Sequence, residues 1–202
     1  MTADRVSWIA GLTLMPVLLL SGQQPTGHPY FPLSVGNSWE YRVRVSIPRR
    51  EESKVVWRVT KAEKNTAGSL VYQVWPTPMQ ADDAAMMLAT TGTGIEEVST
   101  RSLVLKWPLT IGDHWEGGGH VREGQSPPAF KVLSVGQACS VASKEFPDCA
   151  VVEERDPGTQ MQTITTYAKG VGPVEYKYFR IRQGGKQEEV QTVRLDSYRI
   201  AQ

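Results

Sequence analysis

The densest group of residues that could do chemistry lies in the stretch GDHWEGGGH, residues 112–120. It contains four candidate metal ligands, Asp113, His114, Glu116 and His120. Imidazole nitrogens and carboxylate oxygens suit zinc, and the glycines would let the chain curl around an ion. Strand alternation argues against such a site, because His114 and Glu116 would project outward wherever Trp115 points inward. We therefore interpret the stretch as a surface loop and expect no metal.

Other catalytic arrangements have little support. Adjacent carboxylates face opposite sides of a strand and do not act together as acid and base; the pairs concerned are Asp82–Asp83, Glu96–Glu97 and Glu188–Glu189. The glycines at 170–172 lack the helix and the Lys-Ser/Thr of a phosphate-binding loop. A hydrolase would need a general base, and the chain has only three histidines, His28, His114 and His120. We predict no catalytic residue, no cofactor and no enzymatic activity.

The charge balance excludes one class of partner. The chain has 202 residues, with 22 Lys and Arg against 21 Asp and Glu, and a formal net charge of +1. A nucleic-acid-binding protein needs a basic face that displaces counterions, so we expect no nucleic-acid partner. The length is sufficient for one domain with a substantial core.

The apolar residues of the chain alternate with a period of two. In SWEYRVRVSI, residues 38–47, Trp39 and every second residue after it point one way, while charged residues point the other way. Similar segments recur to residue 200 between Gly, Pro, Asn and Asp turns. Only ADDAAMML, residues 81–88, has helix-forming composition, and it could equally open a strand that runs to Thr91. We predict an all-β fold of antiparallel strands, forming a barrel, half-barrel or sandwich, with at most one short helix.

One phrase occurs twice, as FPLSVGNSWEY in residues 31–41 and as WPLTIGDHWEG in residues 107–117. Gly36 and Gly112 stand where a turn needs a positive φ angle, and Trp39 and Trp115 are the first inward residues of the strands that follow. We predict two similar structural corners, at the start of two related halves of the sheet. A ligand-binding tryptophan repeat would recur many times with exposed rings, which fits two distant copies badly.

The chain has two cysteines, Cys139 and Cys149, in a segment with the pattern of a hairpin. With a turn centred on Lys144 they would face each other across the two strands, close enough to bridge. A disulfide over this loop would contribute about 2–3 kcal/mol to stability. Free buried thiols are the alternative. A metal or redox role would need a Cys-x-x-Cys or nearby histidines, and neither is present.

The first 22 residues have the layout of a secretory signal peptide, with Arg5, the apolar run at 8–20, and then Ser21 and Gly22. Retention as an uncleaved anchor and a buried N-terminal helix are the alternatives. Residues 23–29 form a flexible polar lead-in, and residues 30–202 form a single β-rich domain. We expect an extracytoplasmic protein, periplasmic or secreted, which contacts a membrane only through an uncleaved N-terminal segment.

Four phrases carry a resemblance to a known group of proteins. They are YFPLSVGNSWEY (30–41), KWPLTIGDHWEG (106–117), SVASKEFPDCAVVE (140–153) and YAKGVGPVEYKY (167–178). The set resembles uncharacterised secreted or lipoprotein-like bacterial proteins that begin with Phe-Pro-Leu-x-x-Gly-Asn-x-Trp-x-Tyr and end with Tyr-Ala-x-Gly-Val-Gly-x-Val. The resemblance covers most of the chain beyond residue 29. It implies a β-rich extracytoplasmic domain and supplies no catalytic residues. Gln23 stands where such relatives often have a lipidated cysteine.

Two functional hypotheses follow from these observations. The first is a non-enzymatic interaction or structural module of the bacterial envelope, whose partner would be another envelope protein. The second is a carrier that binds a small hydrophobic molecule or lipid in a groove of the sheet, since curved sheets readily hold a ligand. Tyr176 and Tyr178 share one strand face, with Phe179 on the other, and one of these faces would be available for a partner or covered by another sheet. A hydrolase is the remaining and weakest alternative.

Overall fold

The computed structural model describes residues 27–46, 51–78, 84–118 and 126–201. Within these ranges the chain is all-β and antiparallel, which confirms the predicted fold class. The elements are β1 (Ser38–Val45), β2 (Glu51–Lys64), β3 (Leu70–Thr77), β4 (Met86–Thr91), β5 (Gly94–Glu97), β6 (Ser102–Lys106), β7 (His114–Glu116), β8 (Ala129–Val141), β9 (Lys144–Asp156), β10 (Met161–Ala168), β11 (Gly172–Ile181), the 3-10 turn η1 (Gln183–Gly185) and β12 (Gln187–Arg199). No helix in the described residues is long and apolar enough to cross a membrane. The expected signal peptide, residues 1–22, lies outside the described residues.

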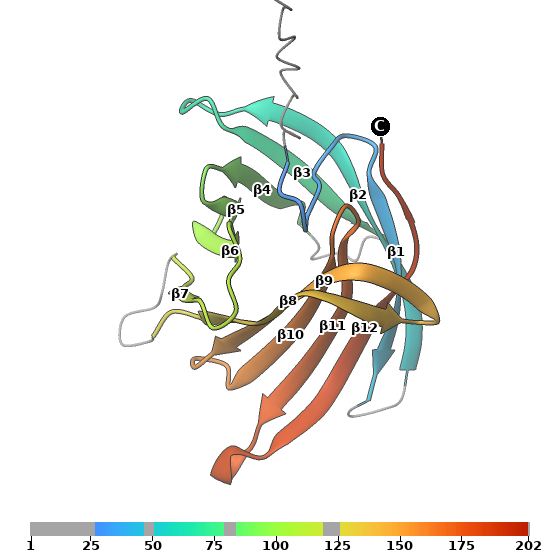
Figure 1. Cartoon of the computed structure of the whole chain (residues 1–202), viewed down its shortest axis with the longest axis vertical. Helices are drawn as coiled ribbons and strands as arrows, with labels where there is room; N and C mark the ends of the chain where they lie inside the picture. The colour runs from blue at the N-terminus through green and yellow to red at the C-terminus, as the bar shows by residue number, and fades with distance from the viewer. Residues whose placement is uncertain (1–26, 47–50, 79–83, 119–125, 202) are drawn as a thin grey trace, which may run out of the picture.

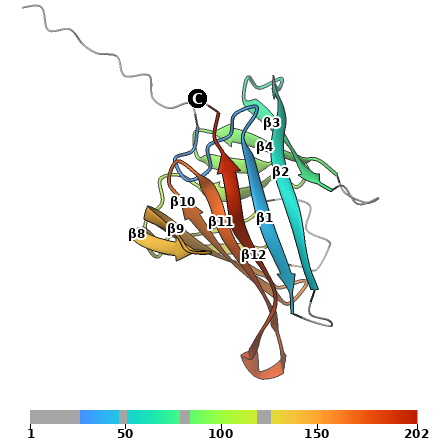
Figure 2. The same cartoon turned by 90° about the vertical axis from the view of Figure 1, so that its right-hand side faces the viewer.

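All twelve strands form one sheet in the order β6-β5-β4-β3-β2-β1-β12-β11-β10-β9-β8-β7. The sheet curls into a nearly closed barrel, as Figure 1 shows, and Figure 2 gives the view turned by 90°. The two edge strands approach each other without strand pairing. Across this seam the indole Nε1 of Trp115 on β7 donates to the carbonyl oxygen of Leu103 on β6 at 2.7 Å. Of the architectures that the sequence left open, the barrel is therefore the one adopted.

The barrel consists of two six-stranded meanders, β1–β6 and β7–β12, which join where β1 pairs with β12. Each repeated phrase leads into the first strand of one meander. Antiparallel pairing makes β1 and β7 run in the same direction, so both phrases lie at the same end of the barrel. The halves also share a Gly-x-Gly turn between their fourth and fifth strands, with Gly94 ending one turn and Gly172 ending the other.

The two corners have the same backbone hydrogen bonds. Gly36 N–H donates to the carbonyl oxygen of Val59, and Gly112 N–H donates to that of Val132, both at 2.9 Å. Val59 and Val132 return a bond at 2.9 Å to the residue that follows each glycine. The glycines have φ angles of +94° and +86°, which a side chain would disfavour. The repeated letters therefore encode one turn that each half uses to start its sheet.

The tryptophans of the two phrases differ in their surroundings. Trp39 is 0% exposed, because β1 is flanked by both β2 and β12, and its Nε1 donates to the carbonyl oxygen of Val171 at 2.6 Å. Trp115 is only half-buried, because β7 is an edge strand with one neighbour. It stacks on Phe130 with ring centroids 5.2 Å apart and planes 3° from parallel.

The segment at residues 28–33, here called the plug, closes the end of the barrel where the phrases lie. His28 is 5% exposed and its Nε2 is hydrogen-bonded to the carbonyl oxygen of Lys106 at 3.0 Å. Tyr30 Oη donates to Asp148 Oδ1 at 2.5 Å, so the plug contacts both halves. His28 is thus held in place, which differs from the expectation of a flexible lead-in at this residue. The sequence does not show that His28 is held in place, because the partners of the plug lie far along the chain.

The β8–β9 hairpin carries a disulfide between Cys139 and Cys149, with Cα atoms 6.0 Å apart. The expected register is wrong. The turn is at Ala142 and Ser143, which have φ angles of +49° and +67°, and Cys149 stands opposite Gln137 rather than Cys139. A register shift between Gln137 and Cys139 gives β9 an extra residue, which brings the two sulfur atoms together diagonally.

Candidate functional site

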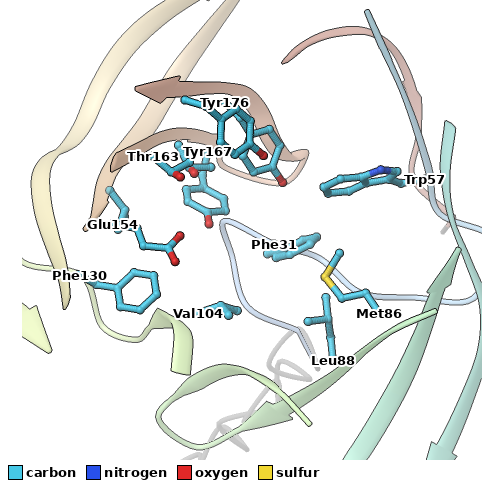
Figure 3. Close-up of a pocket in the computed structure, with 13 residues that line it drawn as sticks. Phe31, Trp57, Met86, Leu88, Val104, Phe130, Glu154, Thr163, Tyr167 and Tyr176 are labelled. Carbon is cyan, nitrogen blue, oxygen red and sulfur yellow. The ribbon is translucent and has the colours of Figure 1, made fainter. Parts of the chain in front are cut away.

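A cavity of about 190 Å³ lies inside the barrel (Figure 3). Its walls come from both halves, so neither meander could form it alone. The lining residues are Phe31, Trp57, Met86, Leu88, Val104, Phe130, Val152, Glu154, Thr163, Thr165, Tyr167, Tyr176 and Tyr178. Tyr176 and Tyr178 both line the cavity, so they share one strand face as expected, and this face of β11 points into the barrel.

Aromatic rings form the floor and one wall of the cavity. Phe31, from the plug, packs edge-on against Trp39 with centroids 5.8 Å apart and lies 6.3 Å from the ring of Tyr167. On the wall, Trp57 and Tyr176 lie 5.6 Å apart. These contacts close the cavity on the side of the plug and leave a largely apolar interior.

One row of inward side chains crosses four strands at the other end of the cavity. Glu154 on β9 pairs in register with Phe130 on β8 and with Thr163 on β10, and Thr163 pairs with Tyr178 on β11. Asp148, which contacts the plug, lies six residues earlier on β9, so Glu154 is about 20 Å further along this tilted strand at 3.3 Å per residue. The row combines one carboxyl group with two hydroxyl groups and a phenyl ring.

Glu154 is the only ionisable carboxyl group among the described residues of the lining. Burial raises its pKa from the usual 4.5, and the like charges of Asp156 and Glu97 raise it further. No described residue donates a hydrogen bond to its side chain or forms an ion pair with it. The neighbouring Glu153 is different, because it faces outward and pairs with Arg155 at 2.9 Å. Figure 3 shows the Glu154 carboxyl group directed into the cavity.

The tyrosines of the cavity stay protonated at neutral pH. Burial raises the pKa of Tyr178 to about 12, with a further contribution from the charge of Glu154. Burial also raises the pKa of Tyr167 and Tyr176 well above 10. Their hydroxyl groups can therefore donate or accept hydrogen bonds but do not act as bases.

The structure does not gather the metal candidates of residues 112–120. Asp113 pairs with Lys106 at 3.0 Å, and His114 and Glu116 are exposed on either side of Trp115. His120 lies outside the described residues, as do Asp82 and Asp83. No group of three or more potential ligands occurs in the part of the chain that the structure describes. Gly170 to Gly172 form the β10–β11 turn and make no phosphate loop.

Sequence reasoning missed Glu154. The segment EFPDCAVVEER predicts a strand, and Val152 is an inward residue of that strand. Counting two residues from Val152 reaches Glu154, so alternation could have marked a carboxyl group on the inner face. The alternation could not predict the cavity, because the cavity also depends on Phe31, Trp57 and Met86 from the other half.

Replacement of Glu154 by glutamine is expected to stabilise the protein in a pH-dependent way. The native pKa of Glu154 is raised, so the native state holds its proton more tightly than the unfolded chain does. The stability of the wild type relative to E154Q should therefore be highest near pH 4 and fall as pH rises through the raised native pKa. We expect E154Q to be more stable by on the order of 1 kcal/mol at pH 8. Urea unfolding at pH 4, 6 and 8 measures the free energy of unfolding of E154Q and of the wild type. A stability advantage of E154Q that grows toward low pH would contradict the prediction.

Two solved structures are similar to this chain. A Bacteroides fragilis protein, described as exported and as having a YmcC-like fold, matches with a TM-score of 0.47 and 12% identity, over 84% of this chain and 98% of its own. A Parabacteroides distasonis protein, described as a lipoprotein, matches with a TM-score of 0.44 and 10% identity, over 86% of this chain and 99% of its own. No family model and no curated protein matches the chain.

Proposed function

We propose that this protein is an exported, non-catalytic carrier that holds one small, largely apolar molecule inside its barrel. The observation that supports the proposal is the cavity between the two halves, which has an aromatic floor and wall and a small number of polar groups. Small-molecule sites in proteins have this composition, with mostly apolar walls and a few placed polar groups. The signal-like N-terminal segment supports export.

The volume limits the size of the ligand. Drug-sized ligands occupy pockets of roughly 300–1,000 Å³, whereas an apolar cavity of about 150 Å³ is large enough for benzene. At about 190 Å³, this cavity suits one aromatic ring with a short side chain, or a short alkyl chain. A long acyl chain would have to protrude from the barrel. The ligand class is therefore a compact monocyclic or short-chain molecule.

The proposal predicts that filling the cavity abolishes binding. Met86 and Met87 are neighbours on β4, but only Met86 lines the cavity and Met87 faces the other side of the sheet. The test uses 2-phenylethanol as a neutral probe in isothermal titration. Met86→Trp should weaken its binding by at least about tenfold, a loss of 1.4 kcal/mol, whereas Met87→Trp should leave the affinity within about twofold.

A second experiment, together with the titration, distinguishes the carrier from the interaction module. Native mass spectrometry of protein extracted gently from its host should show an additional small mass that Met86→Trp removes. Equal binding of 2-phenylethanol by the two variants, or failure of the wild type to bind this alcohol and its positively and negatively charged analogues, would overturn the carrier proposal. In that case the interaction-module hypothesis, with another envelope protein as partner, would be the better one.

A further inference from the structure

We propose that the molecule carried in the barrel is an amphiphilic amine, whose ammonium group pairs with the Glu154 carboxylate while its apolar part lies against Phe31 and Trp57. This inference rests on the proposed carrier function and names the class of its ligand. It starts from the direction of Glu154, which points into a largely apolar cavity and has no ion-pair partner among the described residues. A carboxylate in such surroundings gains most from a ligand that supplies the missing positive charge.

The charge of the lining excludes the opposite class of ligand. Among the described residues, the lining contains one carboxyl group and no lysine, arginine or histidine. The nearest basic residue in sequence, Arg155, faces outward and pairs with Glu153. An acid such as a fatty acid would therefore bring its negative charge beside Glu154 with no counter-charge. A cation meets the opposite situation, because Asp156 and Glu97 add negative charge near Glu154.

Aromatic groups beside Glu154 also suit a cation. Phe130 lies next to Glu154 on one side in the strand register, and Tyr178 lies two strands away on the other side. The negative face of an aromatic ring attracts an ammonium group within about 6 Å of its centroid. The hydroxyl groups of Thr163 and Tyr178 can accept hydrogen bonds from the ammonium group. The row therefore offers a bound ammonium group a carboxylate, hydrogen-bond acceptors and aromatic ring faces.

Three probes with the same ring test this inference: 2-phenylethylamine, 2-phenylethanol and 3-phenylpropanoate. They differ mainly in the charge at the end of the side chain, which is positive, neutral or negative at pH 7.5. We expect the wild type to bind the amine at least about tenfold more tightly than the alcohol and to bind the propanoate most weakly. E154Q should lose the preference for the amine and keep its affinity for the alcohol.

The control is Glu145→Gln, which removes the same charge from an exposed position on the same strand and should keep the preference for the amine.

The preference should also grow from pH 5 to pH 8 in the wild type and stay flat in E154Q. Glu154 loses its proton as the pH rises through its raised pKa; the charges of Asp156 and Glu97 act on it, and its own charge acts on Tyr167 and Tyr178.

The outcomes distinguish this inference from the carrier function. The inference of an amine ligand would be overturned if the wild type bound the amine and the alcohol equally, or if E154Q kept the preference for the amine. The carrier function would then stand with a neutral ligand. Tightest binding of 3-phenylpropanoate would also overturn the inference of an amine ligand. If none of the probes binds, both the carrier function and the amine are overturned.

Discussion

Trp39→Ala is expected to lower the free energy of unfolding by about 3–5 kcal/mol. The indole is fully buried, and its removal leaves a void between Phe31 and the β10–β11 turn. It also leaves the carbonyl oxygen of Val171 without its donor. Gly172 packs so closely on the indole that an added Cβ would lie 3.1 Å from Trp39 Nε1, so the substitution also removes the packing support of this turn. Urea unfolding followed by circular dichroism measures the loss.

Trp115→Ala is the matched comparison, because it removes the same side chain from the same position of the other phrase. The ring of Trp115 is partly exposed on an edge strand, so its removal should cost about 1–2 kcal/mol. The two losses should differ because one strand is central and the other is an edge. A loss for Trp115→Ala equal to or larger than that for Trp39→Ala would contradict the explanation from central and edge strands.

Gly94→Ala is expected to cost about 3 kcal/mol, through both backbone strain and steric overlap. Gly94 has a φ angle of +148°, which L side chains rarely adopt. A Cβ at this position would lie 2.0 Å from the carbonyl oxygen of Leu105, a backbone atom that cannot rotate away. The strand β5 would have to separate from β6, next to the seam of the barrel. Thermal unfolding should show a clear decrease in Tm.

Gly92→Ala is the control for this effect in the same turn. No heavy atom lies within 4 Å of a Cβ built there, and the residue is exposed. Alanine should change the stability by no more than about 0.5 kcal/mol and can raise it, because it restricts the unfolded chain. If Gly92→Ala and Gly94→Ala lowered the stability equally, the close approach of Gly94 to β6 would not be the cause of the loss.

Local patterns predicted the strands and the corners. The alternation in residues 38–47 requires only that one strand face is buried, and Gly36 and Gly112 satisfy a turn whose geometry is formed within a few residues. Such signals depend on neighbours in the chain, so the sequence carries them directly. The β8–β9 hairpin was also visible, but its register was not, because the register depends on which residues of the two strands pair, and the extra residue of β9 was not recognised from the sequence.

The amino-acid sequence by itself therefore determined an antiparallel β protein with two equivalent corners, since strand period and turn chemistry are local properties. Only the tertiary structure decided that Trp39 is central and Trp115 lies at a seam, that His28 is buried in the plug, and that Glu154 faces a cavity. Each of these depends on which distant strands become neighbours. That choice is made by closure of the whole sheet, in which residues more than 70 positions apart, such as His28 and Lys106, are brought together.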